Sequence, residues 1–377
     1  MGAVFGVADA QGDRWRRLRK AVNGPFSLPK MKRYMEFFRK SNNSLLEFLG
    51  EEAAKGDKVD MRDLIQRYVV NTMGAVGLGM EVNAFKDKDC ELMKNGSALS
   101  EMWRWLVIMM MPSIAALFRV QCYNPKAENW FTSLLRRLMK SKNEGGNDVL
   151  SVLMKIHQED PEDFDQLAVE KTILQFFFDG YNSTADAITG ALALIVTNPE
   201  CMAKLREEVD EVFENKDDGD IEVTDSEING MNYLDCVVLE AMRFLTIPAT
   251  SRRVTKTYKI PGTETTLPVG VAVFIPWHAL CMDPEFWENP TEFNPERFNA
   301  ENKPKIRAGT YNPFGSGPRA CLGSNYAKFQ MKMVIAYLLR FFDIENCDNL
   351  PKNFEIDPNT LFTPKDGLKV KFHKRDV

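Results

Sequence analysis

The sequence predicts a mainly α-helical protein with small β-sheets. Apolar residues recur at helical spacing, several times with Ser, Asp or Pro near the first residue, in segments 13–22, 29–55, 60–80, 125–141, 165–197, 199–214, 231–245 and 324–342. Strand signals are few, and they cluster between Arg252 and Ile275, where β-branched and polar residues alternate around turn residues. We find no internal repeat, so a repeat architecture is not expected.

Composition excludes several classes of protein. The 377 residues are 44% hydrophobic and 27% charged, which suits one large globular domain or two smaller ones. The formal net charge of −5 provides no global basic field, so nucleic acid is not an expected partner. The seven cysteines are scattered without a C-x-x-C pair, which favours free thiols in a reducing compartment.

The longest apolar run extends from Trp105 to Phe118 and is interrupted by Pro112. It is shorter than the ~20 apolar residues that a membrane-spanning helix needs. The run therefore belongs either to the core or to a segment that dips into a membrane surface. The first twenty residues lack the apolar stretch of a signal peptide.

A loop with Gly315, Gly317 and Arg319 leads to Cys321, directly before the amphipathic segment 324–342. Backbone N–H groups at a helix start and a nearby guanidinium both favour a thiolate. On this reasoning alone, a small buried structural cysteine remains the alternative. A dinucleotide-binding glycine motif is excluded, because residues 309–313 do not form the apolar strand that such a motif requires.

The same stretch, Phe314-Gly-x-Gly-x-Arg319-x-Cys321-x-Gly323, resembles without a gap the haem-ligating signature of the cytochrome P-450 family. The resemblance implies the fold of that family and haem b (iron protoporphyrin IX) as the cofactor. It also implies that Cys321 is the iron ligand and that Phe314, Arg319 and Gly323 belong to the haem-binding loop.

Further motifs follow in the order of the family. Glu240-x-x-Arg243 and Arg297 resemble its buried charge triad, which would fix the irregular stretch 283–313. Three more residues resemble the groups that bind the haem propionates together with Arg319, namely Trp15, Arg19 and Arg253. Two departures, Thr246 for a usual proline and Cys281-Met282 for a usual His-Arg, are expected to alter packing more than chemistry.

The oxygen-activating helix of the family corresponds here to Asp179-Gly180-Tyr181-Asn182-Ser183-Thr184. Asn182 replaces the usual acid, and Asp179 replaces a small apolar residue over the haem beside Gly180. Protonation of reduced oxygen needs a hydroxyl relay with a proton source behind it. We expect Ser183 to act as the relay, with Asp179 or Thr184 behind it. A degraded or repurposed oxygen site is the alternative.

The resemblance extends from about Asp13 to the C-terminus. It implies one haem-thiolate domain over residues 1–377, N-terminally truncated, without the upstream anchor and the first sheet strands of the family. The run from Lys204 to Phe213 is similar to the animal microsomal branch. By that resemblance we expect the endoplasmic reticulum membrane, cytosolic face, as the location, with peripheral membrane contact by this chain.

The resemblance implies a monooxygenase that uses O2 to oxidise a lipophilic small molecule. Electrons would come from NADPH-cytochrome reductase or a similar donor, which would dock on basic residues near the N-terminus, namely Arg14, Arg16, Arg17 and Lys20. Two alternatives remain open: a haem-thiolate isomerase or dehydratase of a fatty peroxide, which needs no reductase, and an inactive truncated haem binder.

Overall fold

The computed structural model describes residues 6–7, 10–24, 26, 28–99, 101, 103–104, 107–108, 111–142, 146–162, 164–214, 222–358 and 360–377. Two compact units divide the chain. The first unit comprises Met1–Met231 and Leu322–Val377, and the second comprises Asn232–Cys321.

The first unit is mostly helical. Its helices are α1 (Gly12–Asn23), α2 (Leu28–Lys55), α3 (Met61–Met73), α4 (Glu91–Leu99), α6 (Pro112–Leu117), α7 (Pro125–Ser141), α8 (Val149–Glu159), α9 (Gln166–Val196), α10 (Pro199–Glu214), α11 (Asp225–Gly230) and α14 (Ser324–Phe341). A π-helical turn, Gly74–Leu78, extends α3.

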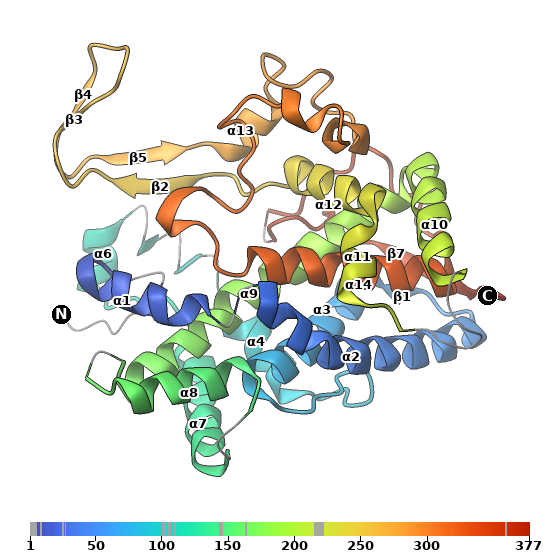
Figure 1. Ribbon diagram of the computed structural model, residues 1–377, viewed down its shortest axis with the longest axis horizontal. Coiled ribbons are helices and arrows are strands. Elements are labelled where there is room, and N and C mark those ends of the chain that lie inside the picture. The colour runs from blue at the N-terminus through green and yellow to red at the C-terminus, as the bar shows by residue number, and fades with distance from the viewer. Residues whose placement is uncertain are drawn as a thin grey trace. The chain divides into compact units, whose positions relative to one another are not determined.

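The helix α9 is the centre of this unit, and α3, α7, α8 and α14 pack against it (Figure 1). Asp165 caps its N-terminus by accepting a hydrogen bond from the amide of Ala168 at 2.7 Å. Every residue from Thr184 to Val196 is buried, so this half of α9 is enclosed on all sides. The other half, toward the N-terminus, includes the partly exposed residues that the sequence assigns to oxygen activation.

A small antiparallel sheet completes the first unit, with strand order β1-β7-β6. β1 (Val59–Asp60) pairs with β7 (Lys369–Lys374), and Val59 lies opposite Val370. β6 (Phe342–Asn346) begins directly after α14 and pairs with the other side of β7. The sheet therefore ties the end of α14 to the C-terminal strand.

The second unit contains α12 (Asn232–Phe244), α13 (Trp277–Met282) and two antiparallel strand pairs. β2 (Thr250–Arg253) pairs with β5 (Ala272–Ile275), and the ribbon ends in the β3 (Tyr258–Lys259) and β4 (Thr266–Leu267) pair (Figure 1). From Asp283 to Pro313 the chain has only short 3-10 turns, so the irregular stretch that the sequence indicates is confirmed.

A small apolar cluster holds this irregular stretch on α12. Cys236 and Leu239 of α12 are buried against Trp287 and Phe298, and Tyr311 packs against the same cluster. The Tyr311 hydroxyl donates a hydrogen bond to the carbonyl oxygen of Leu239 at 2.9 Å. The loop is thus anchored at several points along its length by apolar and polar contacts with one helix.

No helix in the described part of the chain is long and apolar enough to cross a membrane. Four apolar side chains at α6 and its ends are nevertheless exposed. Leu117 is 76% exposed and Phe118 is 73% exposed, and Met111 and Ile114 are also exposed. The beginning of the apolar run, at Trp105, lies outside the described residues. These four side chains belong to the surface and not to the core.

Candidate functional site

Glu240 and Arg243 form a buried ion pair on α12. Arg243 donates from Nε to Glu240 Oε2 at 2.8 Å and from Nη2 to Oε1 at 2.9 Å, and both side chains are 0% exposed. The i, i+3 spacing places the two groups on one helix face, where a guanidinium can bind a carboxylate through two bonds. The pair is the charged centre of the second unit.

Arg297 completes the triad. Its Nε lies 3.4 Å from Glu240 Oε1, and its Nη2 donates to the carbonyl of Asn289 at 2.8 Å. Glu240 Oε1 also accepts a hydrogen bond from the amide of Asn294 at 3.0 Å. The triad therefore binds main-chain groups of the irregular stretch, whose own backbone hydrogen bonds form only local turns.

Arg243 also forms a hydrogen bond to the Cys281-Met282 segment, where the sequence departs from the family. Its Nη1 donates to the carbonyl of Cys281 at 2.7 Å and lies 3.8 Å from the sulfur of Met282. The thiol of Cys281 is buried and donates to the carbonyl of Thr310 at 3.5 Å. Burial raises the pKa of Cys281 to about 11, so this thiol stays neutral near pH 7.

Thr246 is 4% exposed, and its hydroxyl has no hydrogen-bond partner among the described residues. A proline at this position would bring no hydroxyl into the same buried environment. The departure thus leaves a buried polar group without compensation, which costs free energy of folding.

Cys321 ends a loop with two left-handed glycines, Gly315 at φ 70° and Gly317 at φ 74°. Glycine adopts this conformation without steric cost, which explains both positions. The amide of Cys321 donates to the carbonyl of Phe314 at 2.8 Å, and this bond closes the loop. None of the seven cysteines, all within the described residues, forms a disulfide; four are buried, two are half-buried, and Cys321 is exposed.

The residues of this loop fit haem. An exposed thiol follows a tight glycine turn and precedes Gly323, which caps α14, and the Arg319 side chain is exposed beside it. Thiolate ligation of haem iron needs one accessible sulfur, not a cluster of ligands. No group of three or more His, Cys, Asp or Glu side chains in the described part of the chain could hold a metal ion.

The other residues that the sequence assigns to the haem propionates belong to both units. Arg253 is exposed at the end of β2, opposite Ala272. Trp15 and Arg19 lie four residues apart on α1, and both are half-buried. Four other basic residues of this helix are exposed, namely Arg14, Arg16, Arg17 and Lys20. Trp15 and Arg19 therefore share a face that differs from the basic, exposed one.

On α9, Asp179 is exposed and Ser183 is half-buried. The hydroxyl of Ser183 donates to the main-chain oxygen of Asp179. Bonds of this kind from a serine to the i−4 carbonyl locally bend a helix. They also leave the serine oxygen able to accept a proton or a hydrogen bond. Thr184, the other relay residue expected from the sequence, is 5% exposed.

Gly180 lies against a neighbouring helix. A Cβ atom at this position would lie 3.1 Å from Cε of Met73 on α3. Glycine therefore permits the close approach of α9 and α3 at this turn. Its role toward haem stays a prediction.

Sequence reasoning missed one carboxylate of α9. Asp186 is 2% exposed and accepts hydrogen bonds from Arg62, Leu361 and Thr363. The available signal was an acid within an otherwise apolar half of the helix, since a charged residue at such a place must be paired.

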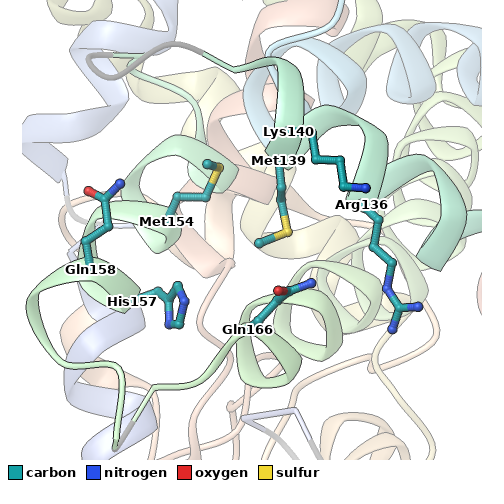
Figure 2. A pocket seen from close by; sticks show the side chains of 7 residues that line it. All are labelled: Arg136, Met139, Lys140, Met154, His157, Gln158 and Gln166. Carbon is teal, nitrogen blue, oxygen red and sulfur yellow. The ribbon is translucent and has the colours of Figure 1, made fainter.

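Side chains of α7, α8 and the start of α9 line a cavity of about 480 Å³. Figure 2 shows these side chains from close by. The lining includes Arg136, Lys140, His157 and Gln166, and none of the site residues expected from the sequence. Arg136 is bound to the buried carboxylate of Glu170 through bonds of 2.8 and 3.1 Å. Met139 and Met154 also line this cavity, so its lining is mixed polar and apolar.

Comparison with known proteins gives the class. The family model described as "Cytochrome P450" matches residues 3–372. The chain is 27% identical over 386 residues to cytochrome P450 3A18 of Rattus norvegicus. The alignment covers 98% of this chain and 76% of that protein. Lithocholate 6-beta-hydroxylase of Mesocricetus auratus and cytochrome P450 6B6 of Helicoverpa armigera are each 26% identical over 386 residues, with the same coverage.

These matches and the helical fold define a haem-dependent monooxygenase, an oxidoreductase that uses molecular oxygen. The chain belongs to the cytochrome P-450 family. Family membership establishes haem b as its cofactor and confirms the fold class that the sequence predicts.

Proposed function

We propose that this chain oxidises a lipophilic small molecule with electrons from NADPH-cytochrome reductase or a similar flavoprotein. The observation that carries the proposal is the accessible thiol of Cys321 at the end of its glycine loop, within a unit whose buried triad holds the neighbouring irregular stretch. When bound, haem b supplies the iron that activates O2.

In this proposal, the cofactor is bound by the residues that the resemblance assigns to it. Cys321 is the iron ligand. Phe314 and Gly323 of the same loop, and Gly180 of α9, also bind haem. Propionate carboxylates would be neutralised by charge-assisted hydrogen bonds from Trp15, Arg19, Arg253 and Arg319. We also propose, as the resemblance implies, that residues 1–377 are one haem-thiolate domain.

Ser183 is the proposed proton relay, with Asp179 as the proton source. The partial exposure of Ser183 and its bond to the Asp179 main chain support this assignment over Thr184, which is buried. The Asn182 side chain cannot release a proton, so Asp179 takes the place of the usual acid.

A lipophilic substrate is consistent with the relative named lithocholate 6-beta-hydroxylase, whose name gives lithocholate as its substrate. The exposed apolar side chains around α6 support peripheral contact with a membrane surface. By family resemblance, we propose the cytosolic face of the endoplasmic reticulum as its location.

The test is reconstitution of the haem-loaded chain with purified reductase, NADPH and a steroid probe such as progesterone in isotopically labelled O2. A labelled hydroxylated product that requires both NADPH and reductase supports the proposal. Conversion of a fatty hydroperoxide without reductase, and no labelled product from progesterone, would instead indicate an isomerase or dehydratase. Failure to bind haem in stoichiometric amount would indicate an inactive haem binder.

A further inference from the structure

The cavity lined by α7, α8 and the first turn of α9 belongs entirely to the first unit. Its volume of about 480 Å³ lies within the range of roughly 300–1,000 Å³ that is usual for small-molecule sites. None of its lining residues is assigned to haem, oxygen or substrate in the proposed function. The cavity therefore calls for a ligand of its own.

The lining has a half-buried, mostly apolar part and an exposed, polar part. Met139, Met154 and His157 are half-buried, whereas the other four lining side chains are exposed. Figure 2 shows the thioether of Met139 between His157 on one side and Lys140 and Arg136 on the other. The two methionines thus provide adaptable apolar surface next to a group of hydrogen-bond donors.

The charge of the lining is positive. Arg136 and Lys140 contribute two cations, and no carboxylate is among the seven lining residues. Two acids adjoin lining residues in the sequence, and both are engaged elsewhere. Glu159 Oε1 lies 3.8 Å from Lys155 Nζ, and Asp165 caps the N-terminus of α9. The electrostatic environment of the cavity therefore favours an anionic group.

The polar groups of the lining retain donors for a ligand. Arg136 uses Nε and Nη2 to bind the buried carboxylate of Glu170, and Nη1 has no partner in the described part of the chain. The same holds for the ammonium group of Lys140. The His157 ring donates from Nδ1 to the carbonyl oxygen of Phe164 at 2.7 Å, which leaves Nε2. Two cationic donors thus remain, and cations form the stronger hydrogen bonds to anionic oxygens.

We propose that this cavity is a second binding site, which takes an amphipathic small molecule with one anionic oxygen group, a sulfate or a carboxylate. The anionic group binds Arg136 and Lys140, and the apolar body of the molecule lies on Met139 and Met154. The inference goes beyond the proposed function, because it holds whether or not the chain oxidises a substrate.

Dehydroepiandrosterone sulfate is the probe, and dehydroepiandrosterone is its neutral counterpart. Calorimetric titration uses the haem-loaded chain with clotrimazole bound at the iron, so that the haem pocket is closed to both steroids. The sulfate should bind about tenfold more tightly than the neutral steroid, because only the sulfate accepts charge-assisted hydrogen bonds. Its affinity should fall as the salt concentration rises. Equal affinities, or no binding of the sulfate, would overturn the proposal.

Lys140→Met removes one cation and keeps the length of the side chain. It should raise the dissociation constant of the steroid sulfate about tenfold, and Lys140→Arg should restore the affinity. Arg136 is left unchanged, because its loss would leave the buried carboxylate of Glu170 without its cation. Lys126→Met is the matched control, since Lys126 is exposed near the other end of α7 and does not line the cavity. The same loss in Lys126→Met would show that only the overall charge matters, and the proposal would be wrong.

Methyl spectra of the carbon-13-labelled ferrous carbon-monoxide form locate the bound steroid without any substitution. The methyl signals of Met139 and Met154 should shift on addition of the steroid sulfate, whereas the signal of Met73, which lies against Gly180, should not. A shift of Met73 alone would place the ligand elsewhere and refute the site. If inorganic sulfate displaces the steroid sulfate at equal concentration, the cavity binds an anion only, and the amphipathic assignment is wrong.

Discussion

Arg243 binds Glu240 through two hydrogen bonds, and water reaches neither side chain. A buried charge without its partner costs several kcal/mol, so each residue of the pair requires the other. The pair also bonds the main chain at Cys281, Glu292 and Asn294. The pair therefore fixes the shape of the irregular stretch and also stabilises the second unit.

We expect Glu240→Ala and Arg243→Ala each to lower the free energy of unfolding by about 3–5 kcal/mol, because the remaining charge is left buried. Thermal melts and haem content measure this loss. Lys303→Ala is the control in the same unit, since its ion pair with Asp235 is 3.8 Å long and partly exposed. It should cost less than about 1 kcal/mol. Equal effects in all variants would contradict the assignment.

The ferrous carbon-monoxide complex should have the strongly red-shifted Soret band of thiolate ligation, and Cys321→Ser should abolish it. Cys347→Ser, at a half-buried cysteine of the first unit, should leave the band unchanged. Persistence of the shifted band in Cys321→Ser would show that another residue is the ligand.

Asp179→Ala should lower turnover and raise the hydrogen peroxide released per electron consumed, because Ser183 loses its proton source. Asp179→Asn should behave in the same way, since an amide cannot release the proton. Asp179 could also bind the substrate, and the spectral dissociation constant of the substrate, measured in the same variants, tests this second role. A weaker constant with unchanged peroxide release would mean that Asp179 anchors the substrate, and no change in either would refute both roles.

Charge reversal at Arg16 and Lys20 should slow electron transfer from the reductase more at low salt than at high salt, because salt screens attraction between exposed charges. Both side chains are exposed on α1, where Arg16 pairs with Asp13. Reversal at Lys126 and Lys155, exposed on α7 and α8, is the control and should have no such effect. A loss that is equal at all salt concentrations would indicate damage to the fold.

Asp210 should make the stability of the first unit dependent on pH. Burial acts to raise its pKa, but hydrogen bonds from Arg375 and Arg340 outweigh burial and lower the pKa below 3.8. Because the folded pKa lies below the unfolded one, the stabilisation is present above about pH 4 and is lost as the pH falls through the folded value.

Asp210→Asn should therefore lower the free energy of unfolding by about 1–2 kcal/mol at pH 7, and by less near pH 3. Denaturant unfolding at both pH values measures the difference. Asp343→Asn, which loses a more exposed ion pair with Arg206, is the control. A difference between wild type and Asp210→Asn that is independent of pH would contradict this assignment.

The segments with long helical periodicity were predicted well, because burial of one face fixes both their position and their length. The segment 165–197 corresponds to α9, and 324–342 corresponds to α14. Shorter elements were missed. α4 has Asn, Gly and Ser among its residues, and β6 begins at the residue after α14 with no turn residue between them.

The sequence by itself determined the cysteine loop and the Glu240–Arg243 pair, because each depends on residue types at short, fixed spacings, and the resemblance of these motifs to the family added Arg297. Only the tertiary structure decided which polar groups are buried together. The partners of Asp186 lie 124 and more residues away, at Arg62, Leu361 and Thr363, and no local pattern links them. A buried carboxylate must find donors, but which donors reach it depends on how the helices and the C-terminal turn pack.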